Sequence, residues 1–226
     1  MVELIPAVLP KSFAELTQVL GRLHGLPAQA GVSPIVQVDL VGTNVLAGQY
    51  AMPLWEEFDF EFDIMLHDPR GVVEQCIDLG ASRVVVHAEA QSAKETVAFL
   101  QPMRGGEFPV EVGVALRAHD VLDALEPFGP LRQLADGGLY DYVQVMGIDH
   151  IGQQGEPPDP HGKEIELIRA LREQFPDLVI QVDGAVAPHV RELVAAGANR
   201  LVVGSVLTQA NNPKIVYKAL YTEANR

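Results

Sequence analysis

Cysteine, basic residues and long apolar runs are all scarce in this chain of 226 residues. The single cysteine, Cys76, cannot form an internal disulfide. It falls within an apolar helical pattern, which indicates a packing role and a reducing compartment. Only 16 Lys and Arg oppose 30 Asp and Glu, which gives a formal net charge of -14. A surface this acidic repels polyphosphate, so we expect no nucleic-acid partner.

Neither a membrane span nor a leader segment is expected. Nowhere do about 18 apolar residues occur together without a charge or a turn residue, and no basic stretch followed by a long apolar run opens the chain. We therefore expect a cytoplasmic protein with no membrane partner. Of the residues, 48% are hydrophobic and only 20% are charged, a composition typical of a folded globular chain.

Short β-branched runs alternate along the chain with longer segments of helical period. The expected strands are 3–9, 35–41, 59–66, 83–89, 109–117, 142–149, 178–186 and 200–207. The expected helices are 11–25, 50–57, 69–80, 91–104, 119–135, 163–175, 188–197 and 213–224. Eight βα units predict an α/β protein with a single (β/α)8 TIM barrel domain over residues 1–226. A doubly wound open sheet fits less well, because no glycine-rich turn follows the first strand.

Functional side chains of a TIM barrel come from the carboxyl ends of its strands and from the loops that follow. The candidates there are Asp39, Asp63, His87, Glu89, Arg117, Met146, Asp149 and Asp183, with Gln37 and Gln181 one alternation deeper. Because side chains alternate along a strand, we expect Asp39, Asp63 and Asp183 to converge on the barrel mouth. Three carboxylates there would need a metal ion, shared protons or hydrogen-bond partners, whereas a lone Asp at such a position often only caps a helix.

Two of these carboxylates lie on different sides of the expected ring, Asp39 on the second strand and Asp183 on the seventh. Such a pair can remove a proton from one face of a carbon and deliver one to the other face, which is the chemistry of an epimerase. Removing a proton beside a carbonyl creates an enediolate, whose charge must be stabilised by a metal ion or by hydrogen-bond donors.

Glycines follow the last two strands, in the strings Asp183-Gly184-Ala185-Val186 and Val203-Gly204-Ser205-Val206. Loops at these places usually bind phosphate in this fold through backbone N–H groups, which would reconcile a phosphorylated ligand with an acidic protein. A turn that needs positive φ would also select glycine, so both interpretations stay open. The sixth loop, 148–155, contains Gly152 and could close over a ligand.

Taken together, several strings resemble the ribulose-phosphate 3-epimerase family and its hexulose-phosphate relatives in the ribulose-phosphate-binding barrel superfamily. The matching strings are 5–9, 38–40, 63–66, 86–90, 113–116, 181–186, 195–199 and 203–205. The resemblance implies that Asp39 and Asp183 form the acid/base pair. It also implies substrate or phosphate contacts from Met65, His87, Met146, Gly152, Gly184, Gly204 and Ser205. For His87, a structural hydrogen bond to Glu89 is an equally good interpretation.

The chain departs from the family at the metal site, where the resemblance implies two histidines together with the two aspartates. Gln37 and Asp63 stand at the histidine positions, so the implied ligand set becomes Gln37, Asp39, Asp63 and Asp183. Oxygen ligands favour magnesium or manganese over zinc, and we expect a divalent metal of that kind. The loop histidines His67, His119 and His150 are further candidates to replace the lost imidazoles.

The sequence therefore favours epimerisation at C3 of a ketose phosphate, by default ribulose 5-phosphate to xylulose 5-phosphate. Two alternatives stay open: a different sugar-phosphate isomerase or metal-dependent lyase, and a non-catalytic phosphosugar-binding paralogue. A Schiff-base enzyme is not expected, because none of the five lysines falls in an expected strand. The expected partner is a small phosphorylated sugar, and the resemblance also suggests a homo-oligomer.

Overall fold

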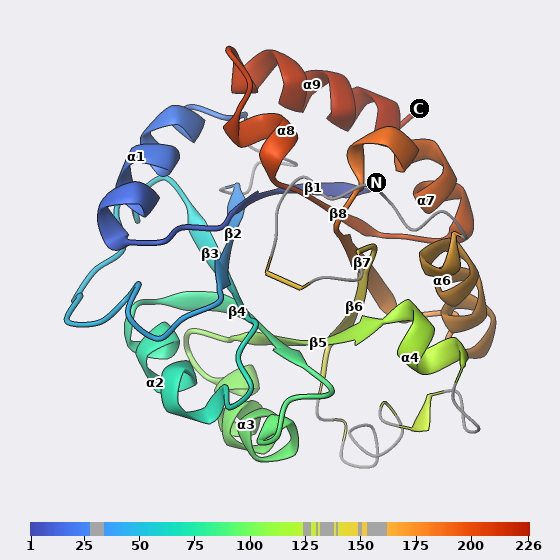
Figure 1. The fold of residues 1–226 in the computed structure, drawn as a ribbon, viewed down its shortest axis with the longest axis horizontal. Coiled ribbons are helices and arrows are strands. Elements are labelled where there is room, and N and C mark those ends of the chain that lie inside the picture. The colour runs from blue at the N-terminus through green and yellow to red at the C-terminus, as the bar shows by residue number, and fades with distance from the viewer. Residues whose placement is uncertain are drawn as a thin grey trace.

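A closed barrel of eight parallel strands forms the centre of the computed structural model (Figure 1). The structure describes residues 1–27, 34–123, 128–129, 131, 138, 140–148, 151–152 and 162–226. The strands are β1 Glu3–Val8, β2 Ile35–Leu40, β3 Asp59–Ile64, β4 Ala81–His87, β5 Glu111–Arg117, β6 Tyr142–Met146, β7 Val179–Asp183 and β8 Arg200–Val203. Each strand pairs in parallel with the next, and β8 pairs with β1. The predicted (β/α)8 TIM barrel is confirmed.

Helices surround the barrel as an outer layer (Figure 1). They are α1 Phe13–Leu23, α2 Arg70–Asp78, α3 Ala93–Leu100, α4 Ala118–Leu122, α6 Lys163–Gln174, α7 Val190–Ala196, α8 Ser205–Thr208 and α9 Pro213–Ala224, with 3-10 turns at Gln101–Gly105 and Ala187–His189. In the described part of the chain, no helix is long and apolar enough to span a bilayer.

Local sequence explains how α1 forms and where it packs. The Ser12 side chain caps the helix by accepting a hydrogen bond from the Glu15 N–H, at 3.2 Å. Leu16, Leu20 and Leu23 follow at helical spacing and are fully buried. They belong to the large apolar core that contains the outward-facing strand residues. Burial of this one face is therefore what attaches α1 to the barrel.

The helix predicted over 50–57 is wrong, because this segment forms turns. Its aromatic residues face solvent, with Tyr50 95% exposed and Trp55 66% exposed. Met52 is its one buried residue, and a single buried side chain does not make the apolar face that would stabilise so short a helix. Leu54 has a positive φ of 56°, which is incompatible with a right-handed helix.

The strand predicted over 200–207 is also too long. It ends at Val203, and α8 begins at Ser205 because Gly204, at φ -94° and ψ -100°, takes the backbone out of the strand conformation. The helix predicted over 119–135 begins as α4 at Ala118, and most of its remainder lies outside the described residues.

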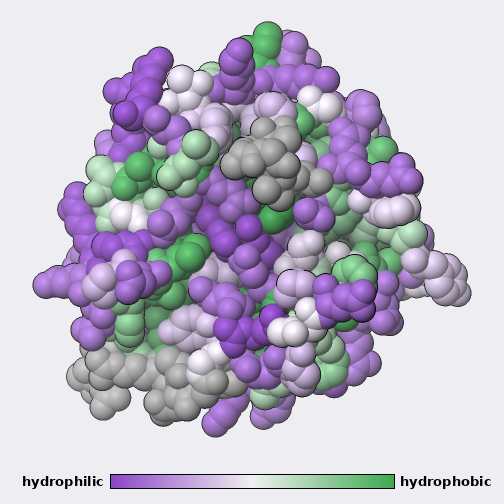
Figure 2. Space-filling view, turned by 180° about the vertical axis from the view of Figure 1, so that it is seen from behind, coloured by the Kyte–Doolittle hydropathy of each residue, from purple (hydrophilic) through white to green (hydrophobic). Residues whose placement is uncertain are grey.

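The amino-terminal mouth of the barrel carries a ring of ion pairs among Glu3, Arg83, Glu111 and Arg200. Arg83 lies 3.1 Å from Glu3 and 3.3 Å from Glu111, and Arg200 lies 3.1 Å and 2.8 Å from the same two carboxylates. These residues lie at or near the starts of β1, β4, β5 and β8. We refer to these four residues as the basal ring. Figure 2, the view from behind Figure 1, shows a largely hydrophilic centre on that face.

Inside the barrel, the Tyr142 ring lies against Gly113 of the neighbouring strand β5. A Cβ added at Gly113 would lie 2.4 Å from the Tyr142 ring, much closer than van der Waals contact. We therefore expect Gly113→Ala to lower the free energy of unfolding by about 1–3 kcal/mol in a urea titration, because the interior is overpacked.

Gly21 in α1 is the matched control, since a Cβ there meets nothing within 4 Å. Gly21→Ala should raise the stability by about 0.5–1 kcal/mol, through helix propensity. Wild-type stability in Gly113→Ala would contradict the close packing at this position.

Candidate active site

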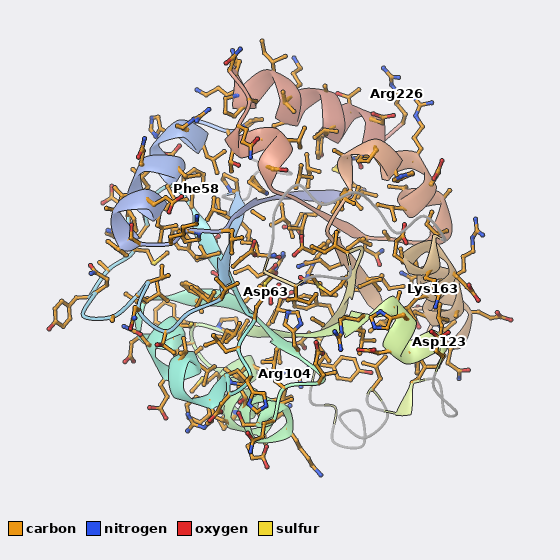
Figure 3. The ribbon with its side chains drawn as sticks, in the orientation of Figure 1. Phe58, Asp63, Arg104, Asp123, Lys163 and Arg226 are labelled. Atoms are coloured by element: carbon orange, nitrogen blue, oxygen red, sulfur yellow. The ribbon has the colours of Figure 1, made fainter. Side chains whose placement is uncertain are left out.

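Three aspartates converge at the carboxyl ends of the strands, as predicted. Asp39 and Asp63 are paired neighbours on β2 and β3, and Asp183 is the last residue of β7. One carboxylate oxygen from each lies within 4.8 Å of the others. Figure 3 shows Asp63 within the ring of strands. Because Asp39 and Asp63 are buried, bulk water does not solvate or screen their charges.

The Gln37 amide connects two of these carboxylates. Its Nε2 donates to Asp39 Oδ1 at 2.8 Å and to Asp183 Oδ2 at 3.0 Å. Its carbonyl oxygen points away and accepts a hydrogen bond from Gln181 at 3.2 Å. The amide nitrogen of Gln37, and not the oxygen that a metal ion would need, therefore faces the aspartates. The role of Gln37 as a metal ligand stays a prediction, and it would require the amide to flip.

Asp63 has two partners of its own. His87 Nε2 lies 3.0 Å from Asp63 Oδ1, and Gln144 Nε2 donates to Asp63 Oδ2 at 2.7 Å. On its other side, His87 Nδ1 lies 3.6 Å from Glu89. Burial opposes the charged imidazolium, but the carboxylates of Asp63 and Glu89 outweigh it and raise the pKa of His87 to about 10. His87 is therefore a cation beside Asp63 at neutral pH.

Negative charge is in excess at this site, even with His87 charged. Burial, followed by repulsion from Asp183 and Asp63, raises the pKa of Asp39 well above its ordinary value. Burial and the charge of Asp63 raise the pKa of Asp183 to about 7. Either protons or a cation would relieve this excess. The groups are thus suited both to exchanging protons near neutral pH and to holding a hard divalent cation through oxygen atoms.

Two methionines line the wall of the barrel beside the carboxylates. Met146 is buried in an interior cluster with Val85, Ala115 and Tyr142, and Met65 packs against the same cluster. The Sδ of Met146 lies 3.3 Å from the Gln144 amide nitrogen. The two residues expected beside a substrate therefore lie together on one side of the barrel.

The predicted phosphate glycines follow adjacent strands, Gly184 after β7 and Gly204 after β8. Gly184 has a φ of +99°, and a Cβ there would lie 2.9 Å from Ile148. Ser205 opens α8 directly after Gly204. Gly184 and Gly204 are thus at the same end of the barrel as Asp183, where the sequence predicts phosphate contact.

Gly152 lies against the loop that follows β2. Its φ is +81°, and a Cβ there would lie 2.6 Å from Cγ1 of Val41, so only glycine fits without a shift. The predicted sixth-loop residues Asp149 and His150 lie outside the described residues.

The loop histidines do not join the aspartates in the part of the chain that the structure describes. The group of possible metal ligands found there contains Asp39, Asp63 and Asp183 alone. His119 instead lies 2.8 Å from Asp120. His67 and His119 are therefore not replacements for the imidazoles implied at the metal site.

Three interior residues, Glu61, Tyr142 and Gln144, are not among the candidates predicted from the sequence. Glu61 and Gln144 lie two residues before Asp63 and Met146, in the same alternation, and that spacing could have indicated that they face the same interior. Both are fully buried, and Tyr142 donates a hydrogen bond to Glu61 at 2.8 Å.

These features define a TIM-barrel protein with a carboxylate-lined site at the carboxyl ends of its strands. The model of the ribulose-phosphate 3 epimerase family matches residues 41–208, and the chain belongs to this family. This confirms the resemblance of its sequence strings.

The curated relatives include ribulose-phosphate 3-epimerase of Schizosaccharomyces pombe, 26% identical to this chain, and the cytoplasmic isoform of Oryza sativa subsp. japonica, 28% identical. Each alignment covers 96% of this chain and 92% of the relative.

Similar solved structures include 3-hexulose-6-phosphate synthase from Salmonella typhimurium, with a TM-score of 0.67, 15% identity and 99% coverage of both chains. KGPDC from Streptococcus mutans has a TM-score of 0.63 and 16% identity, covering 100% of this chain and 98% of that one. The two structures show the fold alone.

The raised pKa of Asp183 predicts how stability depends on pH without metal. Between its ordinary value of 3.8 and about 7, the folded state holds a proton that the unfolded state has lost, so this group's contribution to stability falls as the pH rises. Asp183→Asn should therefore gain stability over wild type progressively from pH 4.5 to 8, reaching on the order of 1–4 kcal/mol. Urea titrations in EDTA at several pH values measure this difference.

Asp68→Asn is the control, because hydrogen bonds from Ser92 and from the Arg70 N–H lower the pKa of Asp68, which keeps its titration below this range. Its difference from wild type should stay constant over the same interval. A flat difference for Asp183→Asn would contradict the raised pKa.

Proposed function

We propose that this protein epimerises a ketose phosphate at C3, with ribulose 5-phosphate and xylulose 5-phosphate as the default pair. The observation that carries the proposal is the meeting of Asp39 and Asp183, from separate strands of the barrel, at one mouth. Two carboxylates that approach a bound carbon from different sides can exchange its proton with inversion.

In the forward step, one aspartate takes the proton from C3 and the electron pair of the C–H bond moves toward the C2 carbonyl, which gives an enediolate. The other aspartate then donates its proton to C3 on the opposite face. The roles of the two aspartates are exchanged in the reverse direction. One carboxylate must start ionised and the other protonated, a state that mutual repulsion between buried carboxylates favours.

Asp39, Asp63 and Asp183 would hold a divalent metal, with magnesium or manganese favoured over zinc because the three ligands are oxygen atoms. Bound there, the metal would stabilise the negative charge of an enediolate. The chain's own contribution is the His87 imidazolium and the N–H donors of Gln37 and Gln144, which hold the carboxylates in place.

Other parts of the mouth would bind the remainder of the substrate. Gly184, Gly204 and Ser205 would donate backbone or hydroxyl hydrogen bonds to the phosphate, which suits an acidic protein because no basic side chain is needed. Met65 and Met146 would exclude water from the enediolate, and Gly152 would lie over the ligand.

The comparisons support this proposal through the names of the relatives, which are ribulose-phosphate 3-epimerases. A cytoplasmic location and a homo-oligomer stay predictions. A different sugar-phosphate isomerase, a metal-dependent lyase and a non-catalytic phosphosugar-binding protein are the alternatives that the following tests separate.

Proton NMR of ribulose 5-phosphate in deuterated water, with magnesium, manganese or zinc added, tests the reaction directly. We expect deuterium to enter at C3 as xylulose 5-phosphate forms. Asp39→Asn and Asp183→Asn should each lower turnover by about a thousandfold or more, because neither amide can transfer the proton.

Asp59→Asn is a matched control, since Asp59 begins the same strand as Asp63 but at the other end. It should keep wild-type turnover. Full activity in either site variant would contradict the acid/base assignment. Absence of exchange with every metal would remove the epimerase proposal and leave the binding role or another substrate.

Metal preference is measured by titrating the EDTA-treated protein with magnesium, manganese and zinc by calorimetry. We expect manganese or magnesium to be preferred, and Asp63→Asn to weaken binding by about tenfold or more, because one oxygen ligand is lost. Asp59→Asn again serves as the control. Tight zinc binding in preference to manganese would contradict the all-oxygen site.

A further inference from the structure

We propose that Gln181 is a positioning residue that orients the hydrogen-bond donors of all three site aspartates without contacting any of them. This inference rests on the proposed function. Gln181 lies two residues before Asp183 in β7 and is fully buried. Its Nε2 lies 3.2 Å from Gln37 Oε1, 2.8 Å from Gln144 Oε1 and 2.6 Å from Glu61 Oε1, so its two hydrogens are shared among three acceptors. Its own carbonyl oxygen is buried and has no hydrogen-bond partner among the residues that the structure describes, so the NH2 end alone determines its orientation.

An amide donates at one end and accepts at the other, so fixing one end fixes the other. Because the carbonyls of Gln37 and Gln144 accept from Gln181, their NH2 groups must point the opposite way. There, Gln37 donates to Asp39 and Asp183, and Gln144 donates to Asp63. The Gln181 side chain thereby determines that the NH2 ends of the Gln37 and Gln144 amides face the three carboxylates.

The orientation of the Gln181 amide is fixed by Glu61, which lies toward the amino-terminal mouth of the barrel. Glu61 accepts from Gln181 through Oε1 and from the Tyr142 hydroxyl through Oε2. Arg83 of the basal ring lies 3.9 Å from Glu61 Oε2. A flipped Gln181 would place its carbonyl oxygen against three acceptor oxygens, which is strongly unfavourable in a buried site. The chain of contacts thus runs from the basal ring to the aspartates.

Loss of the Gln181 NH2 group would leave the buried carbonyl oxygens of Gln37 and Gln144 without this donor. Only the contacts with the aspartates would then hold the two amides, so each amide would shift or flip more readily. In the flipped orientation a carbonyl oxygen would face a carboxylate, which would displace the group that exchanges the proton. Since the hydrogen bonds of Gln181 lead to the groups that hold the aspartates, substrate binding should change much less than the chemical step.

The variant Gln181→Met tests this role, because it keeps the length of the side chain and removes the NH2 group. We expect kcat for C3 epimerisation to fall by about tenfold or more while KM changes by less than about twofold. Gln181→Glu keeps the shape but offers only acceptors when ionised. It should turn both neighbouring amides around and lower kcat in the same way.

Ile5→Ala is the control, since Ile5 is a buried interior residue of β1 in a separate apolar cluster. It removes packing from the same interior without touching these amides and should keep kcat within about twofold of wild type. The positioning role is overturned if Gln181→Met keeps wild-type kcat, or if Ile5→Ala loses as much kcat as Gln181→Met.

A second readout does not depend on activity. The side-chain NH2 resonances of Gln37 and Gln144, assigned by their loss in Gln37→Leu and Gln144→Leu, should be single and protected from solvent exchange in wild type. In Gln181→Met or Gln181→Glu they should become doubled or lose protection, whereas in Ile5→Ala they should not. Unchanged amide signals in both Gln181 variants would overturn the inference even if kcat falls. A wild type without epimerase activity would remove the proposed function but leave this test intact.

Discussion

Repulsion among the buried carboxylates of Asp39, Asp63 and Asp183 is the constraint on which the mouth of the barrel depends. Each of these charges would be costly alone, and grouping them makes the cost larger. The His87 imidazolium and the NH2 groups of two amides point at carboxylate oxygens and stabilise part of this charge. These donors compensate only part of the charge. The remaining excess of negative charge contributes to the raised pKa values of Asp39 and Asp183.

The donor that contacts both Asp39 and Asp183 is a neutral amide, that of Gln37. A lysine or arginine beside the aspartates would cancel their charge and lower their pKa values toward the ordinary range. Gln37 and Gln144 supply directed hydrogen bonds without adding net charge. Asp39 and Asp183 are therefore held in place while their pKa values stay raised. The disadvantage is that an amide has two orientations, and the layer beneath must select one of them.

Much of the fold and of the carboxylate cluster could be predicted from the sequence, because both follow from local periodicity. Alternation along each strand placed Asp39, Asp63 and Asp183 on interior positions once eight βα units closed a ring. The turns at 50–57 were not predictable in this way, since whether Trp55 is buried depends on contacts distant in the chain. The partnership of Gln144 with Asp63 likewise depends on two strands that are not neighbours in the sheet.

Amide orientation shows a further limit of sequence reasoning. The residue type at position 37 indicates a group with both a donor and an acceptor, and nothing local decides which of them faces Asp39. That choice depends on Gln181, 144 positions along the chain. Long-range hydrogen bonds of this kind decide whether a glutamine is a ligand or a donor, so the identity of a polar residue near a site does not fix its role.

The basal ring lies at the amino-terminal mouth of the barrel, and we call this end of the barrel its floor. Its two guanidinium groups are shared between two carboxylates at the mouth opposite the aspartates. Glu61, Tyr142 and Gln181, which lie between this ring and the aspartates, are fully buried, so ligand and solvent reach the aspartates from the side where the loops lie. Changes to the loops can thus alter which molecule enters. Changes to the floor alter how firmly the barrel holds together and also reach the site, because Arg83 contacts Glu61 and Glu61 accepts a hydrogen bond from Gln181. A substitution at one end of the strands therefore acts on the aspartates directly, whereas a substitution at the other end acts on them through buried side chains.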